Sequence, residues 1–337
     1  MEDGAYEIRT DLALETRERV KKNHAQIHGV RFFEEEKSPD MNVSTVIIET
    51  ENAAKTLRRP RGCYVTLEDP RMTEEDAGYH REISLELARC VRRLLPFKQV
   101  EEKSDGKQKD DKTDELEDLS LELDYSVLIV GLGNREVTPD ALGPAVIDNL
   151  YITRHIIKEF GKYAFGKEHT SRISAIVPGV MAQTGMECVE ILRGIVEQTK
   201  PDVMITIDAL AARSTKRLGR TIQLTDTGIT PGSGIGNHRN AINQKSVGIP
   251  VISIGVPTVV DAATIVSDAV SDFIEAMSEK QQEEISRTEP RELARKLLSP
   301  QLHGMFVTPK DIDDTIKQLS YLISEALNIA FLGNKEQ

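Results

Sequence analysis

The sequence has no tryptophan, and aromatic residues make up only 4% of its 337 positions. A protein that stacks nucleic-acid bases on its side chains needs more aromatic residues than this. Basic residues are also the minority among the charged ones, because 43 Lys and Arg stand against 55 Asp and Glu and leave a net charge of -12. The charge argues against a sequence-independent grip on DNA, and a basic partner would be attracted instead. We therefore expect no direct nucleic-acid partner.

Cysteine is scarce as well. Cys63, Cys90 and Cys188 are widely spaced, and none belongs to a Cys-x-x-Cys pair or a Cys/His cluster. This pattern argues against a disulfide framework and a zinc site, and it indicates a reducing, cytoplasmic compartment. The N-terminus lacks the basic and apolar regions of a signal peptide, and no run approaches the roughly 18 apolar residues of a membrane span. We expect no membrane association.

The order of apolar runs predicts an α/β fold. Several strands are apolar on both faces and are separated by helices, which is typical of a sheet that helices cover on both sides. We therefore expect a mainly parallel twisted sheet with helices on both faces. The predicted strands are 41–50, 62–67, 126–130, 172–177, 203–207, 220–224 and 250–255. The predicted helices are 74–95, 139–158, 184–198, 259–276, 279–298 and one that starts at Thr308-Pro309 and runs to about Phe331.

Residues 101–124 differ in composition from the rest of the chain. They contain eleven Asp and Glu against four Lys, a net charge of 4 - 11 = -7. Such a composition is typical of a solvated, mobile surface insertion, although it could also attract a basic substrate. We expect this acidic insertion to be poorly ordered.

The segment from Val127 to Pro144 predicts a strand, a tight turn and a helix start. A β-branched apolar run ends in Gly131-Leu-Gly133-Asn134, and Thr138-Pro-Asp140 follows within a few residues. Asp140 thereby lies at the carboxyl end of a strand, where ligands usually bind in open α/β sheets. The first turn of a helix favours the anion, so we expect a lowered pKa for Asp140. An acid in this position can also be purely structural.

Asp208 is the second candidate acid. It follows the apolar run Val-Met-Ile-Thr-Ile, so burial is expected to raise its pKa. Two carboxyl groups whose pKa values are shifted in opposite directions can act as acid and base on a water molecule. The pattern alone does not show that Asp140 and Asp208 meet.

Other chemistries have weaker support. The Gly131-x-Gly133 turn lacks the third glycine of a dinucleotide fingerprint, and no phosphate-binding Gly-Lys-Ser/Thr follows it. His238 lies in a glycine-rich loop that we expect to cover the site, and a metal held by Asp140, Asp208 and His238 would be chemically reasonable. Cys188 falls inside a predicted helix, where we expect it to pack. Our prediction is that the protein uses no cofactor and no metal.

Several long blocks resemble the germination proteases of spore-forming Firmicutes. They are residues 6–15, 131–144, 177–185, 207–213, 248–261 and 306–311. The resemblance runs nearly from end to end, and it implies an atypical aspartic endopeptidase related in fold to hydrogenase maturation proteases. By this likeness Asp140 and Asp208 are the catalytic pair. We expect Gly131, Gly133, Asn134 and Thr138 to shape the site or bind substrate. We expect the same of His238 from its place in the glycine-rich loop, since the family likeness does not fix a His at that position.

The resemblance also implies a substrate and a zymogen. The family starts the degradation of small acid-soluble spore proteins, in the spore core, as a homotetramer. It cleaves itself at a sequence that imitates its substrates' Thr-Glu-(Phe or Ile)-Ala site, which Thr10-Asp11-Leu12-Ala13 matches here. Thr10 and Asp11, which by pattern alone would cap a helix, then become part of a cut between Asp11 and Leu12. Residues 1–11 are the expected pro-segment, and 12–337 are expected to form one peptidase domain.

Three other functions stay open from the residues. A peptidyl-tRNA hydrolase shares the Gly-Leu-Gly-Asn turn, but it is a small basic protein with a catalytic His. A metal-dependent maturation protease of the same fold would differ in chelator sensitivity. A catalytically silent spore scaffold would keep its first eleven residues on incubation.

Overall fold

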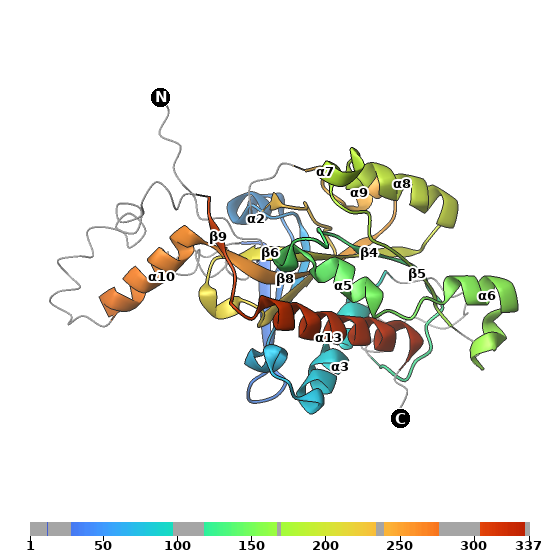
Figure 1. The fold of residues 1–337 in the computed structure, drawn as a ribbon, viewed down its shortest axis with the longest axis horizontal. Helices are drawn as coiled ribbons and strands as arrows, with labels where there is room; N and C mark the ends of the chain where they lie inside the picture. Colours follow the sequence, from blue (N-terminus) through green and yellow to red (C-terminus); the bar gives the residue numbers. More distant parts are fainter. Residues whose placement is uncertain are drawn as a thin grey trace.

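The computed structural model describes residues 12, 28–96, 118–166, 170–233, 239–275 and 304–333 (Figure 1). These residues form a nine-stranded sheet with the order β1-β2-β3-β7-β8-β6-β4-β5, and β9 pairs with β8 outside this path. The strands are β1 Val30–Glu36, β2 Asn42–Ile48, β3 Gly62–Glu68, β4 Ser126–Gly131, β5 Arg172–Ile176, β6 Val203–Ala212, β7 Thr221–Thr225, β8 Val251–Asp261 and β9 Phe306–Val307.

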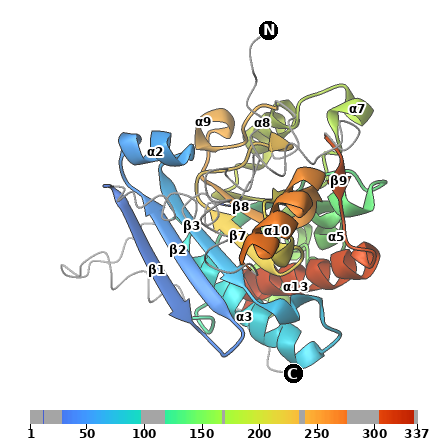
Figure 2. The same ribbon diagram turned by 90° about the vertical axis from the view of Figure 1, so that its left-hand side faces the viewer.

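The sheet has a parallel half and an antiparallel half. Strands β5, β4, β6 and β8 are parallel neighbours. Strands β7, β3, β2 and β1 continue the sheet with antiparallel pairings, and β9 is antiparallel to β8. The predicted α/β class is confirmed, and the parallel pairing lies in the half of the sheet that carries both candidate acids. Sequence reasoning missed β1, the charged and largely exposed edge strand at the left of Figure 2.

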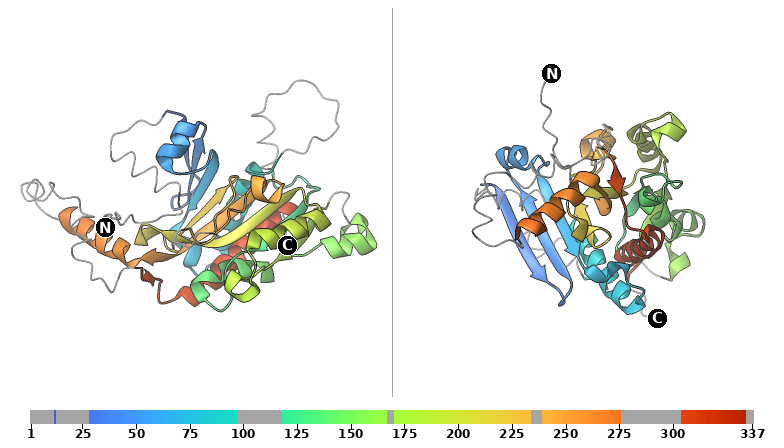
Figure 3. Two further views of the ribbon diagram at one scale, coloured as in Figure 1. Left: turned by 90° about the horizontal axis from the view of Figure 1, so that it is seen from above. Right: turned by 60° about the vertical axis from the view of Figure 1, so that its left-hand side comes forward.

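Helices cover both faces of the parallel strands, which explains why β4 is buried along its whole length. Its alternate side chains enter two different cores: Val127 and Ile129 pack under α3, α5 and α13, whereas Leu128 and Val130 pack under α8. Figures 1 and 3 show α8 and α13 on opposite sides of these strands. The main covering helices are α3 Ala77–Arg93, α5 Leu142–Asp148, α8 Cys188–Thr199 and α13 Ile312–Leu332. The others are α2 Glu51–Leu57, α6 Arg154–Phe160, α7 Met181–Thr184, α9 Gln244–Val247 and α10 Ala262–Glu275.

The predicted helix 139–158 is wrong in its continuity. Residues Thr138–Asp140 form a 3-10 turn, η2, and α5 and α6 are separated by residues 149–153. The break follows from Thr153, whose hydroxyl donates to the Ser171 carbonyl at 2.7 Å and accepts from the Ile173 N–H at 2.9 Å. These bonds hold residue 153 against β5, and a continuous helix would have directed the chain away from this strand. The helix predicted at 184–198 is likewise two helices, α7 and α8.

Two strands are longer than predicted, and the terminal helix starts later. β6 continues from Ile207 to Ala212 and β8 from Gly255 to Asp261, because their ends pair with each other across an irregularity at Leu210/Ala211. Phe306–Val307 pairs with the end of β8, and the Thr308 hydroxyl donates to the Thr258 carbonyl at 2.9 Å. The sequence Thr308-Pro309 therefore does not begin a helix, and α13 starts at Ile312. The helix predicted at 279–298 lies outside the described residues.

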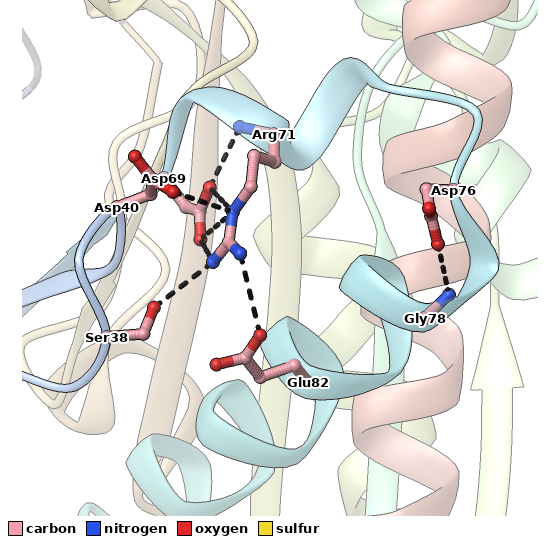
Figure 4. Close-up of polar contacts among 7 residues, drawn as sticks. All are labelled: Ser38, Asp40, Asp69, Arg71, Asp76, Gly78 and Glu82. Carbon is pink, nitrogen blue, oxygen red and sulfur yellow. Dashed lines mark hydrogen bonds and ion pairs between the residues drawn. The ribbon is translucent and has the colours of Figure 1, made fainter.

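A buried ion pair connects the first hairpin to α3 (Figure 4). The carboxylate of Asp69 has no solvent exposure, and its Oδ2 accepts from Arg71 Nη2 at 2.6 Å. The same guanidinium donates to Ser38 Oγ at 3.2 Å and lies 3.6 Å from a Glu82 oxygen. The hydrogen bond to Asp69 raises the pKa of Arg71. The pair holds the β2–β3 side of the sheet against the helix that covers it.

The described end of the acidic insertion, residues 118–124, packs on the core. Leu119 and Leu123 are buried there. The fully buried Arg92 of α3 donates to the carbonyls of Asp118, of Leu121 at 3.0 Å and of Ala330 at 2.8 Å. Burial lowers the pKa of this guanidinium to about 10. The insertion expected at 101–124 is thus joined to α3 and α13 at its C-terminal end, and its residues 101–117 lie outside the described part.

Candidate active site

The first candidate acid is held in a turn that requires glycine. β4 ends at Gly131, which pairs with Ile207, and the Leu132 N–H donates to the Ile207 carbonyl at 2.8 Å. Gly133 has a φ of +110°, and a Cβ on it would lie 1.9 Å from the Asp140 carbonyl oxygen. Only glycine adopts this backbone easily and leaves room for that carbonyl. Gly133 therefore lets the chain fold back until Asp140 faces the end of β4.

Asp140 is half-buried in η2. Its Oδ2 accepts a hydrogen bond of 2.8 Å from the Asn134 N–H across the turn. Burial raises the pKa of the Asp140 carboxyl by more than this hydrogen bond lowers it. The expected lowered pKa is wrong, because η2 is a three-residue 3-10 turn and the short helix after it has little dipole to favour the anion. Compared with water, the site therefore shifts the equilibrium of Asp140 toward its protonated form.

Asp208 lies within β6 and has only 4% exposure. Its Oδ1 accepts from the N–H of Ala209 at 3.0 Å, and the residue pairs with Gly255 of β8 on one side. On the other side β4 has already ended, because Gly131 pairs with Ile207 one residue earlier. Asp208 does not end its strand as expected, yet it is the first residue of β6 beyond the end of β4.

The turn that carries Asp140 packs at this same place. η2 contacts both β6 and β8. A Cβ on Gly143 would lie 2.3 Å from the Leu132 carbonyl oxygen and 2.6 Å from that of Ile207, so α5 begins almost in contact with the backbone next to Asp208. A Cβ on Gly131 would collide with the Gly143 carbonyl at 2.4 Å. The two segments that carry the acids can approach this closely because Gly131 and Gly143 have no side chains.

The topology makes this location a switch point of the sheet. From β4 the chain crosses to β5 on one side, and the next strand, β6, lies on the other side of β4. Ligands in open α/β sheets bind beyond the carboxyl ends of the strands at such a point. Asp140 follows β4, and Asp208 is on β6. Both acids thus lie where this architecture commonly places a reaction.

A segment from Gly179 to Cys188, which includes α7, borders the site. The Gln183 side chain donates from Nε2 to Asn134 Oδ1 at 3.1 Å, and Asn134 in turn holds Asp140. At the other end the half-buried Cys188 thiol lies 3.6 Å from the Gly179 carbonyl oxygen. Burial and the nearby Asp208 carboxylate raise the pKa of this thiol. The segment therefore reaches the surroundings of both acids.

Sequence reasoning missed the role of this segment. Cys188 packs against the core under α8, as expected, but it is also the first residue of that helix and lies within the electrostatic reach of Asp208. Gln183 was not singled out, although it belongs to the block 177–185 that carries part of the family resemblance. Neither residue has a local pattern that predicts chemistry. The signal that could have found them is their position just after a strand of the parallel half.

The structure describes only some of the other predicted site residues. Thr138 begins η2, and its carbonyl accepts from the Ala141 N–H at 3.0 Å. His238, Thr10, Asp11 and Ala13 lie outside the described residues, whereas Leu12 is described and fully buried. In the described ranges no three His, Cys, Asp or Glu side chains are grouped to hold a metal ion. No helix in those ranges has the length and apolarity to cross a membrane.

A large cavity lies elsewhere in the molecule. It has a volume of about 1360 Å³ and lies between α13, the α5–α6 connection and the residues near Leu123. Tyr151, Tyr321 and Asn328 are among its lining residues, and neither Asp140 nor Asp208 is. Catalysis needs reacting groups at the substrate, so we place the candidate site at the two acids and not in this cavity.

Comparison with known proteins agrees with the resemblance seen in the sequence. The model of the germination protease family matches residues 5–288. The germination protease of Caldanaerobacter subterraneus subsp. tengcongensis is 41% identical over 332 residues, which cover 96% of this chain and 94% of the relative. That of Clostridium perfringens is 39% identical, with 98% and 96% covered, and that of Bacillus subtilis is 36% identical, with 96% and 93% covered.

Among solved structures, a [NiFe] hydrogenase maturation protease, HycI from Thermococcus kodakarensis, aligns with 40% of this chain and 74% of its own. The identity is 19% and the TM-score 0.24, too low to support an argument. The relatives, by contrast, match along nearly their whole length. The chain therefore belongs to the germination protease family, and it is an endopeptidase of spore germination.

Proposed function

We propose that this endopeptidase is of the aspartic type and that Asp140 and Asp208 are its catalytic pair. The observation that carries the proposal is the packing of the Asp140 turn against β6 at the point where β4 ends and Asp208 begins. Two carboxyl groups that share a site hold one proton between them, which supplies an acid and a base together.

The raised pKa of Asp140 supports a division of roles between the two acids. In this proposal Asp140 holds the proton and donates it toward the oxygen of the peptide carbonyl, while ionised Asp208 takes a proton from the attacking water. The water oxygen forms a bond to the carbonyl carbon. The bond between this carbon and the peptide nitrogen then breaks, and the nitrogen takes a proton from the pair as it leaves. The Asn134 N–H positions Asp140 through its second oxygen. Catalysis should therefore weaken as the pH rises above the pKa at which the pair loses its shared proton.

We further propose that small acid-soluble spore proteins are the substrates and that the chain first cleaves itself between Asp11 and Leu12. The family resemblance supports both steps. The Leu12 side chain is completely buried, so the folded protein holds the residue that follows the proposed cut. A homotetramer in the cytoplasm of the spore core is the assembly and location that the same resemblance supports.

The test compares Asp140→Asn and Asp208→Asn with the unchanged chain and with Asp148→Asn. Asp148 is a matched control, because it lies at the end of α5 in an exposed pair with Arg135. Each protein is incubated and followed by mass spectrometry for loss of residues 1–11, and by chromatography for cleavage of a Thr-Glu-Ile-Ala peptide. Circular dichroism checks the fold.

Both activities should be lost in the two site variants and kept in Asp148→Asn. Processing at the unchanged rate in either Asp140→Asn or Asp208→Asn would refute the pair. Activity that a chelator removes and one added metal restores would instead assign the chain a metal-dependent mechanism.

A further inference from the structure

The proposed cut poses an electrostatic problem. The residue before it, Asp11, is acidic, as is the Glu of the substrate sequence, while the chain has a net charge of -12 and the site holds two carboxyl groups. Like charges at close range disfavour binding, and a cation at the right place reverses this. The site should therefore contain a basic side chain that is free to accept a carboxylate.

Arg239 lies on the rim of the site in an anchored position. It lies close in the chain to Ile242, which makes two backbone hydrogen bonds with Ile229, of 2.9 and 2.7 Å. Ile242 is fully buried in the core under α8. Three residues before this anchor, the Arg239 guanidinium lies 3.1 Å from Met181 Sδ and 4.0 Å from a Glu187 carboxylate oxygen.

Through these contacts Arg239 packs against the segment from Gly179 to Cys188, which borders both acids. Met181 begins α7, two residues before Gln183, which connects to the Asp140 turn through Asn134. Glu187 directly precedes Cys188. Burial and the Asp208 carboxylate raise the pKa of the Cys188 thiol, whereas the Arg239 guanidinium lowers it. Both charges therefore act on this one side chain.

The guanidinium of Arg239 has unused binding capacity. It carries five N–H donors. Among the described residues its contacts are a thioether, which is a weak acceptor, and a carboxylate at 4.0 Å, too far for a hydrogen bond. Two nearby arginines are engaged: Arg135 makes two bonds to Asp148, of 2.5 and 2.8 Å, and Arg193 donates to the Ser246 carbonyl at 2.5 Å.

We propose that Arg239 binds the acidic side chain immediately before the cleaved bond and so determines the preference for Asp or Glu at that position. The inference rests on the proposed function and names the specificity residue of the same site. A guanidinium presents two parallel N–H groups to a carboxylate, which an uncharged amide cannot match. On binding, the substrate carboxylate takes the place of the distant Glu187 as partner of Arg239.

The experiment measures kcat/KM for two peptides, one containing Thr-Asp-Leu-Ala and the other Thr-Asn-Leu-Ala. Each full chain is incubated until mass spectrometry shows that residues 1–11 are lost, so that all proteins are compared in the processed form. The variants are Arg239→Gln, Arg239→Lys, Glu187→Gln and, as a matched control, Arg193→Gln. The unchanged chain should prefer the Asp peptide by about 10- to 100-fold, the range of a hydrogen bond to a charged group. Arg239→Gln should reduce this ratio to near one by slowing the Asp peptide alone, and Arg239→Lys should restore part of it.

Glu187→Gln separates recognition from a structural role. If Arg239 served only to hold Glu187 at the start of α8, Glu187→Gln would have the same effect as Arg239→Gln on both peptides. We expect instead that Glu187→Gln keeps or increases the preference for Asp, because it removes a competing carboxylate. Arg193→Gln should leave the ratio unchanged.

Different results overturn the inference and the proposed function. Equal cleavage of both peptides by the unchanged chain, or an unchanged ratio in Arg239→Gln, overturns the role of Arg239 and leaves the catalytic pair standing. Equal losses on both peptides in Arg239→Gln also overturn it. Failure of the unchanged chain to cleave either peptide overturns the proposed substrate preference itself.

Discussion

Substituting Gly133 by Ala tests whether the turn beyond β4 positions Asp140. The new Cβ would lie 1.9 Å from the Asp140 carbonyl oxygen, and the backbone has a φ of +110°. The conformational strain costs about 1–2 kcal/mol. Forcing a methyl group into a packed site costs about 1–3 kcal/mol more. We therefore expect the free energy of unfolding to fall by about 2–5 kcal/mol, the sum of these two ranges.

The same substitution should also reduce activity. The contacting atom is backbone of Asp140, so relief of the clash must move the residue that accepts from the Asn134 N–H at 2.8 Å. A displacement of about 1 Å at a reacting group reduces rate by roughly 100-fold. Loss of residues 1–11, followed by mass spectrometry under conditions where the variant is fully folded, measures this effect.

Gly248→Ala is the matched control. Gly248 also has a positive φ, of +84°, but a Cβ there meets no atom within 4 Å. It should show strain of about 1–2 kcal/mol without loss of activity. The reasoning is refuted if Gly133→Ala keeps the unchanged processing rate, or if its stability equals that of Gly248→Ala.

Three further predictions concern buried charge. Asp140→Asn should raise the free energy of unfolding at neutral pH, because the folded protein raises the pKa of this carboxyl and its ionised form therefore costs stability above the unfolded pKa. The gain in stability should shrink as the pH falls through the folded pKa toward about 4. Denaturant titrations at several pH values measure it, and a gain that grows on acidification contradicts the prediction. Arg92→Leu should destabilise by about 3 kcal/mol or more, roughly 1 kcal/mol for each of three carbonyls left without a donor, and urea unfolding within 1 kcal/mol of the unchanged chain would contradict it. Arg71→Gln should cost about 3–5 kcal/mol because it leaves the Asp69 carboxylate buried without its cation, whereas Arg31→Gln, at an exposed pair, should cost under about 1 kcal/mol in the same assay.

Much of the site followed from local sequence patterns. The apolar run before Gly131 and the glycines after it predicted a strand and a tight turn, and the structure has both, because a β-branched run and a positive-φ glycine are local requirements. The run Val-Met-Ile-Thr-Ile similarly predicted burial for Asp208. Periodicity located α3 and the core of α13, since the stripe that faces the sheet is visible in one segment alone.

Long-range contacts decided the rest. Local pattern could not show that β6 extends beyond Asp208, because residues 209–212 are held by pairing with β8, or that Thr153 interrupts a helix by bonding to β5. The pKa direction of Asp140 likewise depends on how deeply the turn is buried. The sequence by itself determined which residues carry acid groups and which glycines bend the chain. Only the tertiary structure decided that the last residue of β4 pairs with Ile207, so that Asp208 is the first residue of β6 beyond the end of β4. It also decided that Gln183 and Arg239 border the same site. Both depend on strand register and side-chain contacts, which join residues far apart in the chain.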